Sequence, residues 1–172
     1  MSCFLGGAGR VLADRNFRLY FAGNAASVLG FWVYRAALGW LTWKITESTT
    51  WLGIIGFAGT APAVFLAPLA GALGDRMGLK RLAMIALAFN GLISLAFAAL
   101  AFADLINIYV ILGATIAHGA AVAFDLPARI ALIPDLISDR STLSSAIALN
   151  STTFHAGAFI GPGVFALFNA FL

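Results

Sequence analysis

Polar and ionisable side chains inside long apolar runs are the residues of this sequence best placed to do chemistry, because an unpaired charge in apolar surroundings is costly. Within residues 19–43, Asn24 and Arg35 are eleven positions apart, which puts them about 20° apart around a helix. Ser27 lies within roughly 60° of the same line. We interpret these three residues as a polar stripe that lines a cavity or couples to an ion. Alternatively, Arg35 extends its guanidinium to water from near the end of the run.

A second set of ionisable side chains lies in residues 106–126 and just beyond them. His118, Asp125 and Arg129 are separated by seven and four positions, so they project within about 40° of one direction on a helix. The order of Asp125 and Arg129 suits an i, i+4 ion pair, which favours a structural role for this pair. His118 is a candidate proton carrier, because imidazole titrates near neutral pH. All three residues are candidates for lining a cavity or coupling to an ion.

The same residues do not assemble into an enzyme site. We find no Ser-His-Asp set, paired carboxylates, phosphate-binding loop or metal-ligand spacing, and Cys3 is the single cysteine. We therefore expect no enzymatic activity, no metal and no cofactor. The basic residues are scattered at the ends of apolar runs instead of forming one face, so nucleic acid is not an expected partner.

Composition indicates that membrane helices position these side chains. Of the 172 residues, 62% are hydrophobic and 10% are charged, and the mean hydropathy is +0.97, which is too apolar for a water-facing surface. Five apolar stretches of about bilayer length follow one another, at residues 19–43, 51–73, 82–103, 106–126 and 146–172. We predict an all-α membrane protein with a bundle of about five transmembrane helices over residues 19–172, preceded by a cytoplasmic segment at residues 1–18.

Small residues within these stretches predict close contacts between helices. Without a hydrophobic force between helices in lipid, glycine lets two backbones approach and gain packing contacts. The glycines to which this applies are Gly53, Gly56, Gly59, Gly119, Gly157 and Gly161.

The basic residues predict how the helices are oriented. Eight of them fall on one side of the bundle: Arg10, Arg15, Arg18, Arg76, Lys80, Arg81, Arg129 and Arg140. The opposite side has only Lys44. Because loops rich in Lys and Arg stay in the cytoplasm, we expect a bacterial inner-membrane protein with its N-terminus inside and residue 172 on the outer side.

The segment between the second and third stretches holds the most specific motif. It reads Gly-Ala-Leu-Gly-Asp-Arg-Met-Gly-Leu-Lys-Arg at residues 71–81, and its motif positions are Gly71, Asp75, Arg76, Gly78, Lys80 and Arg81. This pattern in a cytoplasmic loop resembles the signature loop of the major facilitator superfamily. Gly71 would allow close packing at a helix end, and Gly78 would permit a tight reversal. Asp75 would pair with Arg76 or cap a neighbouring helix.

Other segments resemble one branch of that superfamily, the exporters similar to the enterobactin exporter. They are residues 34–41, 45–48, 52–58 and 123–129, together with the last stretch. There, Asn150 is followed by Gly157-x-x-x-Gly161-Pro162, which looks like the fifth-helix motif of the superfamily's antiporters. The glycine pair usual after this motif is absent. Helix packing with a proline kink explains the same residues equally well.

The resemblance implies a role in membrane transport. A complete transporter of the superfamily has two six-helix halves that rock around a central cavity, and this chain resembles an incomplete N-terminal half. We therefore expect part of a secondary active, proton-coupled exporter of small molecules. The alternative is a non-transporting accessory subunit within a larger membrane complex. In both cases we expect the partners to be the lipid bilayer and another membrane protein chain, either a second copy, a complementary half or a larger complex.

Overall fold

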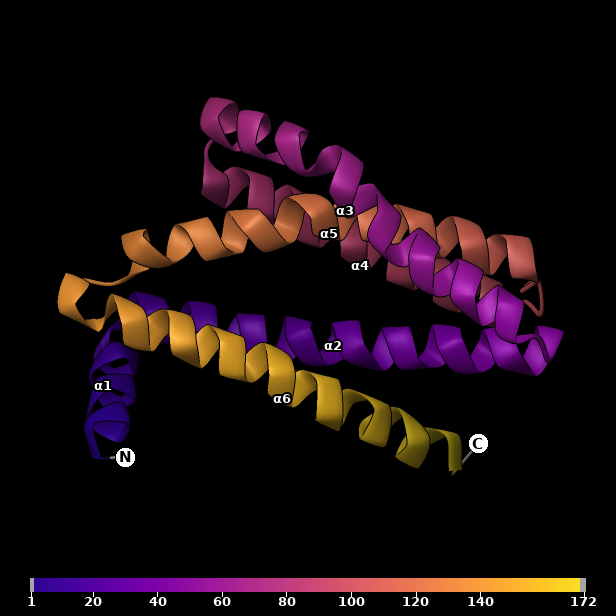
Figure 1. Ribbon diagram of the computed structural model, residues 1–172, viewed down its shortest axis with the longest axis horizontal. Helices are drawn as coiled ribbons and strands as arrows, with labels where there is room; N and C mark the ends of the chain where they lie inside the picture. The colour runs from indigo at the N-terminus through magenta and orange to yellow at the C-terminus, as the bar shows by residue number, and fades with distance from the viewer. Residues whose placement is uncertain (1, 171–172) are drawn as a thin grey trace. The chain divides into compact units, whose positions relative to one another are not determined.

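The computed structural model describes residues 2–170, and helices account for nearly all of them (Figure 1). In chain order the elements are α1 (Ser2–Ala13), α2 (Arg15–Thr46), α3 (Thr49–Met77), α4 (Leu79–Phe102), α5 (Ile108–Leu136), the short 3-10 helix η1 (Arg140–Thr142) and α6 (Leu143–Ala170). No strand occurs between residues 2 and 170. The prediction of an all-α protein is confirmed.

The helices form two compact units, and each is described by itself. Unit 1 contains residues 2–36 and 132–170, which are α1, the first part of α2, the end of α5, η1 and α6. Unit 2 is the continuous segment Ala37–Ala131, which holds the rest of α2, all of α3 and α4, and most of α5.

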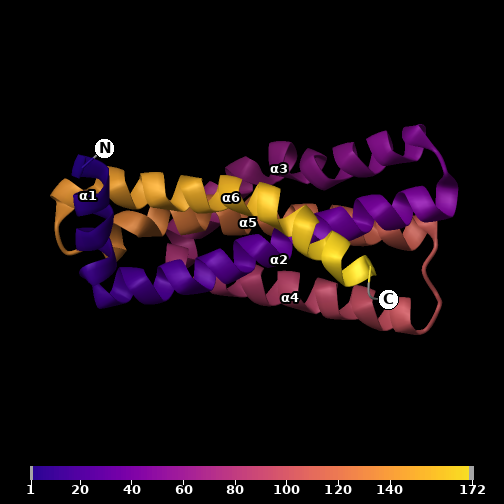
Figure 2. The ribbon, with the colours of Figure 1, turned by 90° about the horizontal axis from the view of Figure 1, so that it is seen from below.

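The most tightly buried part of unit 1 lies where helix ends meet. Phe17 and Ile133 are fully buried, and they cluster with Val11, Ile137 and Ala146. These residues come from α1, α2, α6 and the end of α5 with the turn after it, so apolar contacts join the two chain segments of the unit. Residues 2–13, expected only as part of a cytoplasmic segment, form a helix that runs across the start of α2 (Figures 1 and 2).

Asp14 fixes the short link between α1 and α2. Its Oδ2 accepts hydrogen bonds from the Ser138 hydroxyl, at 2.6 Å, and from the Ser138 backbone N–H, at 3.1 Å. Its Oδ1 accepts from the backbone N–H of Asn16 at 3.0 Å. These bonds, that of the Ser138 hydroxyl first, lower the pKa of Asp14 below its usual value because they favour the ionised carboxylate.

In unit 2, a single residue separates α3 from α4. Gly78 has a φ of 85°, a left-handed conformation that side chains rarely adopt, and its N–H donates to the Gly74 carbonyl at 3.0 Å. The tight reversal predicted for Gly78 is therefore present. At the start of α5, Asn107 acts as an N-cap, because its side-chain oxygen accepts from the backbone N–H groups of Tyr109 and Val110, both at 3.0 Å.

Within residues 2–170, three helices are long and apolar enough to cross a membrane, namely α3, α4 and α5. Only 6% of the most apolar window is buried in α3 and in α4, against 39% in α5. Surfaces so apolar and so exposed fit a lipid environment. Over their described residues, α2 and α6 are as long but do not reach the same hydropathy. The prediction of five crossings therefore remains a prediction.

The helices also extend beyond the apolar stretches read from the sequence. The structure has α3 continue to Met77 and α5 to Leu136, past the expected ends at residues 73 and 126. An apolar run ends where lipid ends, whereas backbone hydrogen bonding can carry a helix on into water. As a result, residues 71–77 of the signature motif are helical, and the loop itself is Gly78 alone.

Candidate functional site

Two asparagines join α2 to α6 in unit 1. The Asn24 side-chain N–H donates to the Asn150 side-chain oxygen at 2.8 Å, and Asn24 is only 7% exposed. An amide inside an apolar helix pair needs such a partner, since an unbonded buried polar group is costly. Asn24 was predicted as part of the polar stripe and Asn150 as part of the fifth-helix motif, and the structure brings the two together.

The glycines of the fifth-helix motif pack against Trp32 of α2. A Cβ added to Gly157 would lie 2.7 Å from Val28 Cγ1, and one added to Gly161 would lie 3.0 Å from the Trp32 backbone carbonyl carbon. The Trp32 indole N–H donates to the Phe154 carbonyl at 3.1 Å. The close approach predicted for Gly157 and Gly161 is confirmed, because their lack of a side chain lets α6 pack closely on α2. Pro162 lies exposed within α6.

The other members of the polar stripe are less enclosed. Ser27 is half-buried and Arg35 is exposed. The Arg35 guanidinium lies 5.8 Å from the Phe31 ring centroid and 5.9 Å from that of Trp32, within range of cation–π attraction. Within unit 1, the stripe thus grades from a buried amide at Asn24 to an exposed cation at Arg35.

The predicted site residues of α5 lie in unit 2. The Arg129 Nε donates to Asp125 Oδ1 at 2.6 Å, which confirms the predicted i, i+4 ion pair, and both side chains are 12% exposed. His118 is buried too, at 9% exposed. The structure therefore keeps the predicted charged pair together on one helix and encloses the histidine two turns before it.

A second close helix contact lies near His118. A Cβ added to Gly119 on α5 would lie 2.5 Å from the Gly59 carbonyl oxygen on α3. The prediction of close approach is correct for Gly59 and Gly119 but wrong for Gly53 and Gly56, around which a Cβ would meet nothing within 4 Å. Spacing along a helix identifies small residues, but it does not tell which of them face another helix.

The charged residues of the signature motif are all exposed. They are Asp75, Arg76, Lys80 and Arg81. No side chain caps the start of α4, and over residues 2–170 Asp75 makes no hydrogen bond or ion pair, so neither partner expected for it is present. The reason is local: residue 75 lies inside the last turns of α3 and Arg76 is its direct neighbour, which places the two side chains on different sides of the helix. Gly71, expected to pack closely, has nothing within 4 Å of an added Cβ.

Two hydrogen bonds between α2 and α6 were not predicted from the sequence. They are the hydrogen bond between Asn24 and Asn150 and the one between the Trp32 indole and the Phe154 carbonyl. For the asparagines a signal existed, because each is an amide in an apolar run and must find a partner there. For Trp32 no comparable signal exists, since its acceptor is a backbone carbonyl.

The comparison with known families fits this arrangement of helices and motif. Residues 10–172 match the family described as transmembrane secretion effectors. The chain belongs to the major facilitator superfamily. The prediction made from the signature motif is thereby confirmed. Members of this superfamily are transporters and not enzymes, and the chain is a bacterial membrane protein.

Two curated relatives are both named for transport. The chain is 27% identical over 148 residues to the staphyloferrin A transporter of Staphylococcus aureus. This match covers 86% of this chain and 37% of the relative. It is 32% identical over 116 residues to the multidrug efflux pump LfrA of Mycolicibacterium smegmatis. This match covers 67% of this chain and 22% of the relative. The chain thus matches less than two fifths of the length of either relative. No solved structure is a significant match.

Proposed function

We propose that this chain takes part in membrane transport, as part of a secondary active, proton-coupled exporter of small molecules. The observation that carries the proposal is the family match over residues 10–172. It is supported by the signature motif, which lies at the reversal between α3 and α4, where exporters of this type are expected to change between inward-open and outward-open states.

The names of the relatives support small organic molecules as the class of substrate. One relative is named for staphyloferrin A and the other for multidrug efflux. The candidate coupling residues in unit 2 are His118, Asp125 and Arg129. His118 and Asp125 are buried, the Arg129 side chain is 12% exposed, and all three lie on α5, the most enclosed of the three candidate membrane helices. In unit 1, Asn24 and Ser27 are the candidates for lining a cavity.

The proposal includes a partner and an orientation. Alternating access needs two bodies that move against one another, so we propose that another membrane protein chain or a second copy completes the transporter. The chain lies in the inner membrane with its N-terminus in the cytoplasm. With this orientation, Asp75 lies at the cytoplasmic rim. Its exposed carboxylate makes no hydrogen bond or ion pair within residues 2–170, so it is available to a group on the opposing body.

The experiment compares Asp75→Asn with Asp104→Asn in everted membrane vesicles. Asp104 is also an exposed carboxylate and lies in the turn between α4 and α5, at a φ of 54° that asparagine also accepts. We expect Asp75→Asn to lower the initial uptake of staphyloferrin A or of a fluorescent amphipathic dye by about 5- to 150-fold, the range of typical conformational couplings. Both variants should insert into membranes as the parent does.

Three outcomes decide the proposal. Uptake by the parent that stops when a protonophore is added supports proton-coupled export. Equal uptake by Asp75→Asn and the parent contradicts the role of the signature motif. Vesicles that take up none of these compounds, from a chain that co-purifies with a large unrelated complex, would contradict transport and favour an accessory subunit.

A further inference from the structure

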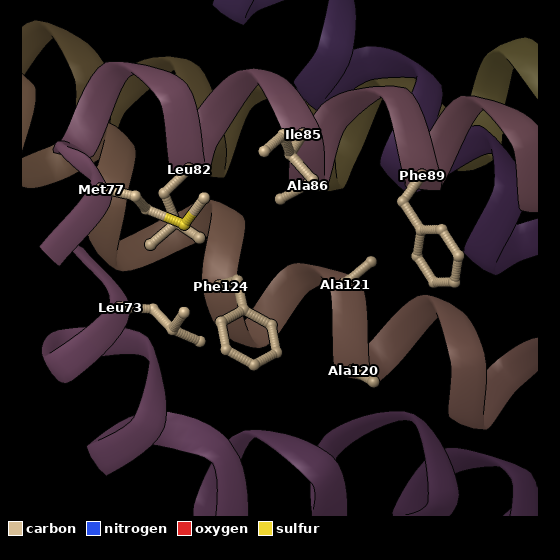
Figure 3. Close-up of a pocket in the computed structure, with 9 residues that line it drawn as sticks. All are labelled: Leu73, Met77, Leu82, Ile85, Ala86, Phe89, Ala120, Ala121 and Phe124. Carbon is tan, nitrogen blue, oxygen red and sulfur yellow. The ribbon is translucent and has the colours of Figure 1, made fainter.

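Unit 2 contains an apolar cavity of about 280 Å³ between α3, α4 and α5. Figure 3 shows side chains of α4 and α5 facing one another across it, with Met77 and Phe124 at one end and Phe89 at the other. Alanines leave the middle open, among them Ala86, Ala120 and Ala121. The volume lies just below the roughly 300–1,000 Å³ of ordinary ligand pockets. It therefore suits part of a molecule, such as one hydrocarbon chain.

The cavity is open on one side. Its floor is buried, with Ala86 at 5% and Ala121 at 4% exposed, whereas Ile85 and Phe89 on its rim are 50% and 53% exposed. The rim residues belong to α4, one of the helices apolar enough to cross a membrane. An opening between apolar rim residues of such a helix admits lipid chains and excludes polar solutes.

Positive charge lies at one end of this groove. Arg81, Ile85 and Phe89 are four residues apart along α4, so the exposed Arg81 continues the stripe that forms the rim. Lys80 and Arg76 add two further exposed cations, and Asp75 is the one acid of this segment. The start of α4 has no side-chain cap, so its unbonded N–H groups add partial positive charge at the same place.

The length of the groove fits one leaflet. From Arg81 to Phe89 the helix rises eight residues, about 12 Å. One leaflet contributes about 15 Å of hydrocarbon. A molecule with a negative head at Arg81 would therefore place its apolar tail along the groove within that leaflet.

We propose that this groove binds one anionic phospholipid, with its phosphate at Lys80 and Arg81 and part of one acyl chain between α4 and α5. The apolar side chains that line the groove would contact the acyl chain, and the cations at its end would attract the negatively charged phosphate. The site does not depend on the proposed transport activity, because it needs only a folded unit 2 in contact with lipid.

The test counts bound lipid by native mass spectrometry on the purified chain in neutral detergent. The probes are dioleoylphosphatidylglycerol, dioleoylphosphatidylcholine with the same tails, and glycerol 3-phosphate with no tail. We expect one phosphatidylglycerol retained per chain, and neither of the other probes. This result separates the phospholipid from a free phosphate and from an uncharged apolar molecule.

Two variants divide the site into its parts. Ala120→Trp fills the groove and should weaken phosphatidylglycerol binding by about tenfold, because the acyl chain then keeps only ordinary lipid contacts. Lys80→Gln/Arg81→Gln should weaken it by about 25-fold, since each cation near an anionic surface contributes about a factor of five. If Ala120→Trp does not fold, Ala120→Leu gives the same test with a smaller side chain.

Matched controls exclude general effects. Ala88→Trp places the same side chain on an exposed position of α4 that does not line the cavity, and Arg15→Gln/Arg18→Gln removes the same charge from unit 1. Both should bind as the parent does, within about twofold. Equal binding of the two phospholipids, or full binding by the filled variant, would overturn the proposal. So would glycerol 3-phosphate binding as tightly as phosphatidylglycerol.

Discussion

Asn24 and Asn150 illustrate how a polar side chain is accommodated within an apolar helix pair. The amide of Asn24 is buried, and Asn150 accepts its hydrogen. Either amide without its partner would destabilise the fold, whereas the hydrogen-bonded pair joins α2 to α6. The cost and the gain can be separated only by removing each partner in turn.

We predict a measurable coupling energy between these two residues. Asn24→Ala and Asn150→Ala should each destabilise the chain, and the double variant should be more stable than the sum of the two changes predicts. The coupling should be about 0.6 to 1.7 kcal/mol, the range found for hydrogen bonds between membrane helices. A double-mutant cycle from denaturant unfolding in detergent measures it. Strict additivity would mean that the bond contributes nothing to stability.

Asp14 gives a prediction on pH. The Ser138 hydroxyl is the largest cause of its lowered pKa, so Ser138→Ala should raise the pKa of Asp14 toward its usual value. A carboxylate with a lowered folded pKa stabilises the fold above its unfolded value of about 3.9, and this contribution is lost as the pH falls through the folded pKa. Titration of the side-chain carboxyl signals by carbon NMR between about pH 2 and pH 6 measures the shift.

Asp139 supplies the control for that titration. Its carboxylate accepts from the Ser141 hydroxyl at 2.7 Å and from the Ser141 N–H at 2.9 Å, and the pKa of Asp139 is lowered for that reason. Ser141→Ala should therefore raise the pKa of Asp139 and leave that of Asp14 in place. If Ser138→Ala moves both groups equally, the change reports a general loosening of unit 1 instead of the individual hydrogen bond.

At the scale of elements, the packing of α6 on α2 depends on Gly161. Alanine at this position would collide with the Trp32 backbone, so α6 must shift and the chain should lose about 1 to 3 kcal/mol. Gly163, two residues later, has nothing within 4 Å of an added Cβ, and Gly163→Ala should be neutral or stabilising by up to about 1 kcal/mol. Thermal unfolding of the two variants compares them directly. Similar melting temperatures would contradict the observed contact.

The crossing of α3 and α5 gives the same test in unit 2. Gly119→Ala would push against the Gly59 carbonyl oxygen, a backbone atom that cannot rotate away, and should cost about 1 to 3 kcal/mol or more. Gly113 lies in open space on the same helix and is the matched control. If both variants unfold at the parent's temperature, the two helices do not approach as closely as the structure has them.

Hydropathy predicted where the helices lie but not where they end or which residues touch. The apolar runs identify α2 to α6, because about 20 apolar residues can mean little else. The segment Ser2–Ala13 has no apolar run of that length, so its helix was not predicted. Its residue Val11 is buried by residues more than a hundred positions away in the sequence. The same limit applies to the site: the ion pair of Asp125 and Arg129 is local and was predictable, whereas the partner of Asn24 is 126 residues away.

For the whole molecule, the orientation in the membrane is the property on which the proposed function depends. Eight basic residues on one side against Lys44 on the other predict that Lys80 is cytoplasmic. In a Cys3→Ser background, Lys80→Cys should resist a membrane-impermeant maleimide in intact spheroplasts and react in inverted vesicles. Lys44→Cys should behave in the opposite way. Reaction of Lys80→Cys with the maleimide in intact spheroplasts would show that the topology is the opposite of the predicted one.

The division of unit 1 between the two ends of the chain has a consequence for the order in which the protein is made. Unit 2 is one uninterrupted segment, so all of its residues are synthesised before α6. Until residue 150 is synthesised, Asn24 lacks its acceptor and Trp32 lacks the Phe154 carbonyl. A chain begins to fold while it is being synthesised. Unit 1 also needs residues 132–170, so unit 2, in the middle of the sequence, should complete its folding before unit 1 does. A nascent chain halted before α6 would then be the species most exposed to membrane quality control.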